Sequence, residues 1–388
     1  NDQLVNFEKA AKKHSLKAKW LVDASGRASL LKRKLALKKK LRHNINAAWF
    51  RIAAKINVDD WSQNAEWQQR NEHSRYLSTN HLYGKGYWTW LIPLSSGSTS
   101  IGIVADERFH SFKSINTFEK AREWLKKHEP QCSAMVEENL DCFQDFLALK
   151  QFSYSCKQLY SADGWCLTGD SGMFLDPLYS PGSDFIGMNN GFITDIISKS
   201  LAGQNISVEV KQHERTFRSI FAGFLPIYED QYPTMANSKV MSSKFIWDIM
   251  MYWGGIGPLF FKQKLTDLKF MELVRPILSE FFILNVSLQK LFRDWAAIDD
   301  AQKHAGGIFL DYAEIPLLQQ LNRNLLEFQE DEALLQQLRK NIKSAEELAA
   351  EIYLEALKYY PELKDENVDL SNSQAGHLKE FYDEFTIC

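Results

Sequence analysis

The chain has 388 residues, of which 46 are Lys or Arg and 49 are Asp or Glu, so that its formal charge is −3. A chain of this length can bury a large core and divide into two subdomains, and its near-neutral charge argues against a nucleic-acid partner. Its five cysteines form no CxxC pair, which argues against a metal site or a disulfide framework and favours a cytoplasmic location with reduced thiols.

The N-terminal region predicts the last strand of a parallel α/β unit. Residues Phe7–Ala18 resemble the end of a helix, Lys19–Asp23 a strand and Ala24–Arg27 a turn. The βαβ units that usually precede such a strand are not in the sequence, so we expect an α/β domain that is incomplete at its N-terminus. The basic run Lys32–His43 predicts a solvated loop or helix face, and the alternative is a docking surface for an acidic partner such as a carrier protein.

Residues 47–105 change to a β pattern. Trp49–Val58 alternates between apolar and polar residues, two strands flank Gly84–Gly86, and a third strand follows the turn Ser95–Ser98. Hairpins of this kind predict an antiparallel meander that is inserted into the α/β domain.

The remainder of the chain predicts mainly helices. Asn116–His128 predicts a helix with Asn116 as its N-cap. Trp165–Thr168 predicts a short strand that returns to the α/β domain and leads into a helix from about Gly182 to about Gly203. From there on the pattern is helical.

Two C-terminal patterns concern helix ends and membrane contact. Phe245–Phe261 is the most apolar stretch, but it has 17 residues and includes a charge, so it predicts a buried helix pair, with a membrane-facing patch as the alternative. Ser344 and Glu347 form a capping box, which predicts a helix that begins there and ends at Pro361. A polar linker is expected at 362–374.

The longest pattern with a chemical meaning is Gly164–Asn190. A strand that ends in Gly169-Asp170 places a carboxylate at the edge of a sheet where α/β folds bind ligands. Gly169 permits close approach of a ligand to the backbone, and Asp170 can accept hydrogen bonds from a polyol. The helix that begins with Pro181-Gly182 directs free amides and the positive end of its dipole into the same crevice, where they stabilise negative charge.

Two further segments have a functional meaning only together with the first. Val22–Ser29 contains the turn D-A-S-G-R, which in isolation is only a turn. In Gly86–Pro93, Trp88 and Trp90 point to the same side of a strand and would form a rigid aromatic wall. A pair of core tryptophans in a hairpin is the alternative.

In this order the three segments resemble the motifs of the flavin-dependent halogenase family, the tryptophan halogenase-like FAD-dependent oxidoreductases. The resemblance implies an α/β fold with a Rossmann-like FAD-binding domain that is incomplete at the N-terminus, an inserted antiparallel β-sheet and a helical C-terminal region. It implies FAD as cofactor and a flavin reductase or NAD(P)H as electron source. The positions that match the cofactor-binding motifs are Asp23, Gly26, Arg27, Gly169, Asp170, Asp176, Pro177, Gly182, Ser183, Met188 and Asn189. Those that would shape or perform the chemistry are Trp88, Trp90, Tyr179 and Ser180.

The chain departs from this family at three points. In the family, the G-x-G-x-x-G phosphate loop and the catalytic lysine lie far before the D-A-S-G-R turn, but only 22 residues precede Asp23, so the sequence resembles a fragment that binds FAD poorly as it stands. Pro181 has no N–H to offer in the S-x-G turn, where family halogenases hold halide on backbone amides. Tyr179 stands where tryptophan-halogenating members carry Glu, which favours phenols, pyrroles or carrier-tethered substrates.

The C-terminal region offers a second group of candidate residues. The stretch that includes Gln231-Tyr232 and Lys239 resembles halogenase-like oxidoreductases of bacterial polyene and polyketide pathways. Within it, Lys244, Asp248 and Tyr252 recur at helical spacing among aromatic residues. They predict either a satisfied buried cluster or a group that orients the substrate, and the wider alternative is a helical lid whose aromatics pack the core.

The sequence therefore predicts an FAD-dependent monooxygenase or other oxidoreductase of the halogenase-like type, acting on an aromatic or polyene-like substrate that is free or bound to a carrier protein. True halogenation and a non-catalytic, partner-binding flavoprotein-like module are the alternatives. The expected division is 1–45 for the first FAD-binding part, 46–150 for the substrate-side sheet and helix, 151–205 for the second FAD-binding segment and 206–388 for the helical substrate or lid region.

Overall fold

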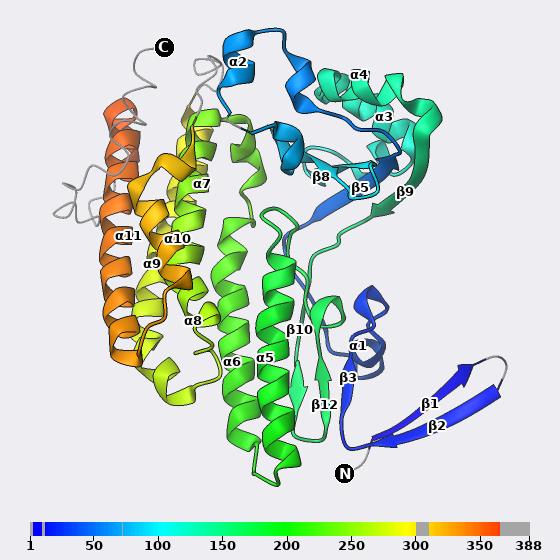
Figure 1. The fold of residues 1–388 in the computed structure, drawn as a ribbon, viewed down its shortest axis with the longest axis vertical. Helices are drawn as coiled ribbons and strands as arrows, with labels where there is room; N and C mark the ends of the chain where they lie inside the picture. The colour runs from blue at the N-terminus through cyan, green and yellow to red at the C-terminus, as the bar shows by residue number, and fades with distance from the viewer. Residues whose placement is uncertain (1–2, 10–11, 72, 300–309, 365–388) are drawn as a thin grey trace.

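The computed structural model describes residues 3–9, 12–71, 73–299 and 310–364, and its mixed α/β part lies beside a helical part (Figure 1). The strands are β1 (Gln3–Lys9), β2 (Lys12–Ala18), β3 (Leu21–Asp23), β4 (Lys38–Lys40), β5 (Ile45–Ile52), β6 (Asn80–Gly84), β7 (Tyr87–Pro93), β8 (Thr99–Asp106), β9 (Phe143–Leu149), β10 (Tyr154–Cys156), β11 (Tyr160–Ser161) and β12 (Trp165–Leu167). The helices are α1 (Leu30–Lys34), α2 (Ala65–Gln69), α3 (Phe118–His128), α4 (Pro130–Glu138), α5 (Pro181–Leu201), α6 (Ser207–Phe224), α7 (Ser238–Met251), α8 (Gly257–Phe261), α9 (Leu268–Ile298), α10 (Pro316–Leu326) and α11 (Asp331–Tyr359).

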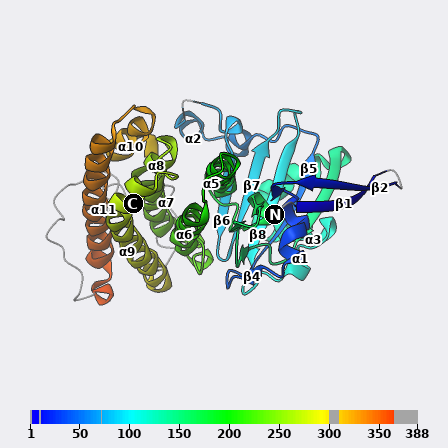
Figure 2. The ribbon, with the colours of Figure 1, turned by 90° about the horizontal axis from the view of Figure 1, so that it is seen from below.

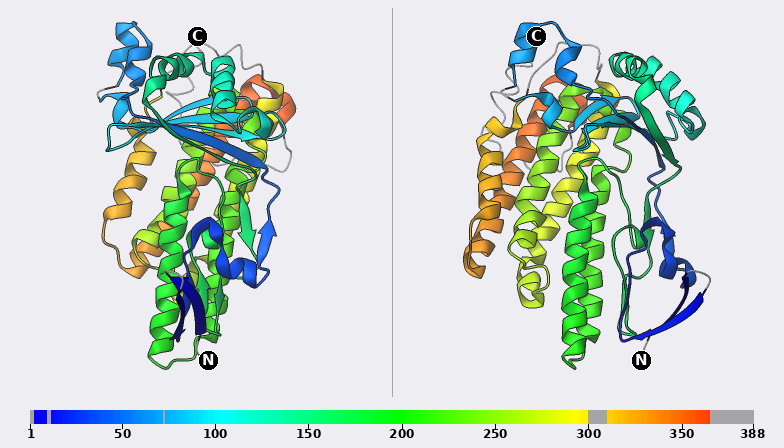
Figure 3. Two further views of the ribbon diagram at one scale, coloured as in Figure 1. Left: turned by 90° about the vertical axis from the view of Figure 1, so that its right-hand side faces the viewer. Right: turned by 45° about the vertical axis from the view of Figure 1, so that its right-hand side comes forward.

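The antiparallel meander expected from the sequence is a five-stranded sheet in the order β6-β7-β8-β5-β9. Alternate residues of β5 face opposite sides: Phe50 and Ile52 pack with α3 and α4, whereas Ile45 and Ala47 belong to the core shared with the helical part. Figure 3 shows the sheet with α3 and α4 on one side and the long helices on the other. Both faces of the sheet are therefore covered.

A smaller sheet in the order β11-β12-β3 joins the two ends of the α/β part. Strands β12 and β3 run parallel, with Cys166 opposite Val22, and β11 pairs antiparallel with β12. The parallel pair places the ends of two sequence motifs next to each other, although the intervening meander separates them along the chain.

The helical part begins with α5 and α6, which lie between the sheets and the remaining helices (Figures 1 and 2). The apolar stretch Phe245–Phe261 is helical and largely buried, as expected, and it contains the end of α7 and the whole of α8. The π-helical turn Tyr252–Ile256 connects α7 directly to α8. Among the described helices none is both long and apolar enough to cross a membrane.

The prediction of a helix end at Phe7–Ala18 is wrong. The structure has the β1–β2 hairpin there, with Gln3 opposite Ala18 in an antiparallel ladder. Every residue of β2 is exposed, so no apolar face is present to stabilise a helix against the core. The hairpin satisfies the backbone hydrogen bonds without such a face.

Two predicted helix starts also need correction. Thr117, not Asn116, is the N-cap of α3, because its backbone is extended and its hydroxyl accepts a hydrogen bond from the amide of Lys120. Ser344 lies inside α11 and does not begin a helix, since the buried face of α11 continues through Ile342, Ala345 and Leu348 without interruption. The helix ends at Tyr359, before Pro361, as predicted. The linker expected at 362–374 lies mostly outside the described residues.

Candidate functional site

The D-A-S-G-R turn and the Gly-Asp turn meet at the carboxyl ends of β3 and β12. The amide of Thr168 donates to the carbonyl oxygen of Asp23 at 3.0 Å, and the Ser171 hydroxyl donates to the same oxygen. Two motifs that are far apart in the sequence thus form one edge of a parallel pair, the place where α/β folds bind ligands.

Asp23 uses its carboxylate to shape its own turn. One carboxylate oxygen accepts from the amide of Ser25 at 2.9 Å and the other from the amide of Leu31 at 2.7 Å. Gly26 has a φ of +59°, a left-handed conformation that suits glycine. The Asp23 side chain is buried and has a positioning role within the protein.

Asp170 differs from Asp23 because its carboxylate accepts no hydrogen bond from any described residue, although the residue is half-buried. Burial raises the pKa of this carboxyl group, and the positive charges of Arg27 and Lys32 act in the opposite direction. Its backbone is held by the Tyr154 hydroxyl, which donates to the Asp170 carbonyl at 2.6 Å. The carboxylate is therefore available to a ligand with hydroxyl groups.

Lys32 lies beneath this turn, contrary to the expectation of a solvated basic run. It is 3% exposed, its Nζ donates to the carbonyl of Gly172 at 3.0 Å, and it lies 3.9 Å from the centroid of the Tyr154 ring. Burial lowers the pKa of Lys32 to about 8. Lys38–Lys40, in β4, are exposed as the sequence predicted.

The pKa of Lys32 gives a pH dependence of stability. Between pH 8 and 10.5 the unfolded chain holds a proton that the folded chain has lost, so a rise in pH favours the folded state. We expect the free energy of unfolding of the parent, relative to a Lys32→Met variant, to increase across this window. Urea unfolding of both proteins on either side of it measures the effect, and a difference that does not change with pH would contradict the burial of a charged lysine.

The loop before α5 has two consecutive residues in the left-handed region, Tyr179 with φ +64° and Ser180 with φ +56°. For residues with a Cβ this conformation costs about 1–2 kcal/mol each. Pro181 is the first residue of α5, and the following amides of Gly182 and Ser183 have no partner within the helix. A Cβ atom at Gly182 would meet no atom within 4 Å, so a side chain or ligand atom could lie beside this residue.

Beneath this loop, four buried residues form a hydrogen-bonded cluster that we call the Asp176 network. His43 Nε2 lies 2.7 Å from Asp176 Oδ2, and the Tyr232 hydroxyl donates to the same oxygen at 2.7 Å. Trp88 Nε1 donates to the Tyr232 hydroxyl at 3.0 Å. The other oxygen of Asp176 accepts from the amide of Leu178. Protein donors therefore occupy the Asp176 carboxylate, and the sequence had not indicated His43.

Trp88 and Trp90 lie side by side on β7, with their ring centroids 5.6 Å apart, in agreement with the expected geometry. Trp88 is buried, and Trp90 is half-buried with its Nε1 bonded to the Ser100 hydroxyl at 3.1 Å. The edge of His81 contacts Trp88 at a centroid distance of 5.1 Å, and burial lowers the pKa of His81 to about 4. A neutral imidazole thus adjoins the tryptophan pair.

The Tyr179 hydroxyl is buried and has no hydrogen-bond partner of normal geometry among the described residues. Burial and the nearby Asp248 carboxylate raise its pKa well above the usual value. Asp248 is itself held by Lys244 Nζ at 2.6 Å and by the side-chain amide of Gln289 at 2.7 Å. The predicted trio is only partly correct, because Tyr252 interacts with Asp184 of α5 and not with this pair.

Three of the remaining predicted cofactor residues, Pro177, Met188 and Asn189, have structural contacts within the protein. Asn189 donates to the carbonyl of Leu167 at 3.0 Å and accepts from the Tyr160 hydroxyl, so its side chain joins α5 to the small sheet. Met188 is buried in the core, Ser183 is exposed at the start of α5, and the Pro177 carbonyl accepts from the amide of Ser180.

The space enclosed between the Gly-Asp turn and the start of α5 is about 20 Å³, which is room for about one water molecule. A larger ligand would therefore contact these residues from the open side. No group of three His, Cys, Asp or Glu residues that could hold a metal ion occurs in the part of the chain that the structure describes.

The curated relatives of this chain include flavin-dependent halogenases, although no family model matches the chain. A flavin-dependent halogenase of Dictyostelium discoideum is 25% identical over 186 residues, which are 47% of this chain and 30% of the relative. A 1H-pyrrole-2-carbonyl-[peptidyl-carrier protein] brominase of Pseudoalteromonas luteoviolacea is 29% identical over 200 residues, which are 50% of this chain and 45% of the relative. The alignments thus span less than half of each of these curated relatives.

Among solved structures, that of the halogenase PltM matches 89% of this chain and 67% of its own chain, with a TM-score of 0.55 and 18% identity. At this identity the likeness concerns the fold, and it supports the mixed α/β architecture with antiparallel sheets and helices. From the motifs, the curated relatives and the shared fold, we conclude that the chain is a relative of the flavin-dependent halogenases.

Proposed function

We propose that the chain forms part of an FAD-dependent oxidoreductase of the halogenase-like type. The observation that carries this proposal is the half-buried Asp170 carboxylate, which accepts no hydrogen bond from the described residues and lines the same small cavity as Gly182 at the start of α5. A hydroxyl-rich ligand with a negative charge satisfies both groups at once, and reduced FAD has a ribityl chain and a negatively charged ring.

The residues fit FAD in the following way. Asp170 would accept hydrogen bonds from the ribityl hydroxyls, and the Gly182 and Ser183 amides would stabilise the ring's negative charge. When bound, reduced FAD supplies the electrons for oxidation with O2. Trp88 and Trp90 would line the route between the flavin and the substrate. Asp23 and Asp176, in contrast, would hold the loops that carry these groups.

We propose an aromatic or polyene-like substrate, free or tethered to a carrier protein. Two relatives act on pyrrole-2-carbonyl groups bound to a peptidyl-carrier protein, which supports a tethered substrate. The exposed lysines of β4 offer a surface to an acidic carrier. A separate flavin reductase or NAD(P)H would supply the electrons, and a cytoplasmic location suits the free cysteines among the described residues. The division into 1–45, 46–150, 151–205 and 206–388 is part of this proposal.

The first experiment measures FAD binding by the protein and by an Asp170→Asn variant. Loss of the charged acceptor should weaken binding about tenfold or more, since hydrogen bonds to charged groups contribute about 1.5–3 kcal/mol. Asp141→Asn, a change at an exposed residue of another loop, serves as the matched control. Flavin binding by Asp170→Asn that equals that of the parent would contradict the proposal.

True halogenation is the second candidate, and the names of the relatives favour it. Against it, Pro181 removes one backbone donor from the S-x-G turn at the start of α5. A dehydrated halide that loses one donor binds about ten- to hundred-fold more weakly, for a cost of about 1–3 kcal/mol.

Bromination of a reporter phenol separates the two candidates. The assay contains the protein, reduced FAD, oxygen and bromide, and it is repeated with a Pro181→Ser variant that restores the N–H. We expect the variant to use bromide at about ten- to hundred-fold lower concentration than the parent. Efficient bromination by the parent, with no gain in the variant, would show that Pro181 does not limit halide use and would favour the halogenase.

A further inference from the structure

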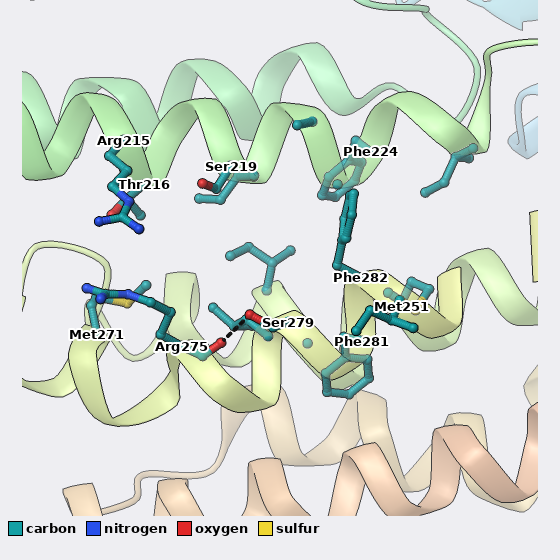
Figure 4. A pocket seen from close by; sticks show the side chains of 18 of the residues that line it. Arg215, Thr216, Ser219, Phe224, Met251, Met271, Arg275, Ser279, Phe281 and Phe282 are labelled. Atoms are coloured by element: carbon teal, nitrogen blue, oxygen red, sulfur yellow. Dashed lines mark hydrogen bonds between the residues drawn. The ribbon is translucent and has the colours of Figure 1, made fainter. Parts of the chain in front are cut away.

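A groove lies between α6 and α9, away from the residues discussed so far. Its volume is about 520 Å³, within the roughly 300–1,000 Å³ typical of small-molecule sites. Figure 4 shows that Phe224, Met251, Phe281 and Phe282 gather toward one end of it, whereas Arg215 and Arg275 lie at the other. The groove is thus apolar at one end and cationic at the other.

The two arginines approach from facing helices, Arg215 from α6 and Arg275 from α9 (Figure 4). Neither guanidinium forms an ion pair or hydrogen bond with a carboxylate of the described residues. On another side of the same helix, Arg218 pairs with Glu214 at 2.8 Å, and Glu214 also accepts from the amide of Leu159. Arginine does not lose its proton in proteins, so these two exposed residues give this end of the groove a permanent positive charge.

The apolar end is closed on the side of the flavin motif. The Phe224 ring lies 5.3 Å from that of Phe185 and 6.2 Å from that of Tyr252, measured between centroids. Phe185 lines the small cavity beside the Gly-Asp turn. One layer of aromatic rings therefore separates the groove from the proposed cofactor crevice, and the two sites are distinct.

The outer lip of the groove is also apolar. On α9, Phe282 is 42% exposed and Ile283 is 63% exposed. These two neighbouring side chains present apolar surface to water. A ligand with an aliphatic chain would cover this surface, because each buried methylene contributes about 0.8 kcal/mol.

We propose that this groove binds a long-chain aliphatic carboxylate. The chain lies against Phe224, Phe281 and Phe282, and the carboxylate accepts hydrogen bonds from Arg215 and Arg275. Arginine forms two parallel bonds to a carboxylate, which gives the anion a defined position. A membrane surface is less suited to this site, because the two arginines that line the groove lie together at one end of it. The proposal is independent of the proposed flavin chemistry.

The experiment measures binding of cis-parinaric acid, a polyene fatty acid whose fluorescence reports an apolar site, in the absence of flavin. The double variant Arg215→Gln/Arg275→Gln should bind this probe with an affinity about tenfold or more below that of the parent. Ser279→Trp places a large side chain in the groove from an exposed position and should abolish binding. The control Lys211→Gln/Lys269→Gln removes the same charge from the same helices and should leave the affinity unchanged.

Competition with three twelve-carbon compounds identifies the head group. Dodecanoate should displace the probe at lower concentration than dodecanol. Equal displacement by dodecanol would overturn the role of the arginines, and much tighter binding of dodecyl phosphate would overturn the assignment to a carboxylate. Absence of saturable binding by the parent, or unchanged binding by the arginine double variant, would overturn the site itself. A failure to bind FAD would leave all of these results unaffected.

Discussion

The free energy of unfolding of an Asp248→Ala variant should be about 3–5 kcal/mol lower than that of the parent. The Lys244 and Asp248 side chains are 0% and 3% exposed and form an ion pair at 2.6 Å within α7. Removal of the carboxylate leaves the Lys244 ammonium buried without a partner. Urea unfolding measures the loss, and because burial lowers the pKa of Lys244, the deficit should decrease as the pH is raised.

A pair with the same sequence spacing provides the control. Lys290 and Asp294 of α9 also lie four residues apart, at 2.5 Å, but their side chains are 68% and 44% exposed. Asp294→Ala should therefore cost less than about 1 kcal/mol. The double variant Lys244→Met/Asp248→Leu should recover most of the stability, since it removes both buried charges. Equal losses in Asp248→Ala and Asp294→Ala would show that the ammonium of Lys244 reaches water.

The second large effect is expected at the centre of the Asp176 network. Asp176→Ala leaves donors on His43, Tyr232 and the amide of Leu178 without their acceptor, and the network is buried. Each unsatisfied donor costs about 1–3 kcal/mol, and relaxation makes the sum smaller than the parts, so we expect a loss of about 3–4 kcal/mol in the free energy of unfolding.

His213 and Asp195 form the matched control for this prediction. Their Nε2 to Oδ2 distance is also 2.7 Å, but the Asp195 side chain is 21% exposed, so water can replace part of what the substitution removes. Asp195→Ala should cost about 1–2 kcal/mol. If both substitutions lower the free energy of unfolding in urea by the same amount, the contribution of the Asp176 network to stability does not depend on exclusion of water.

Local turn chemistry explains why part of the site could be predicted from the sequence. Gly26 and Gly169 have left-handed backbones at turns that follow short apolar strands, and such turns depend on neighbouring residues. The alternation that places Trp88 and Trp90 on one face is equally local. The hairpins around them were predicted for the same reason.

The missed residues depend on contacts that no local pattern encodes. Lys32 bonds to Gly172, 140 residues away, and His43 bonds to Asp176, 133 residues away. In the sequence both belong to a run of positive charge, which usually indicates exposure. The N-cap of α3 was misplaced by one residue for a different reason. Asn116 and Thr117 are both good cap residues, and only the backbone conformation distinguishes them.

The parallel pairing of β3 with β12 has a consequence for the order in which the molecule folds. The two strands contribute three residues each, and more than 140 residues of chain lie between the partners. Closure of so long a loop is entropically costly for so few backbone contacts. If the five-stranded sheet forms first, it shortens the loop that remains. We therefore expect the two motif turns to come together late in folding, and their correct contact to depend on a sheet that itself contributes few of the ligand-facing groups.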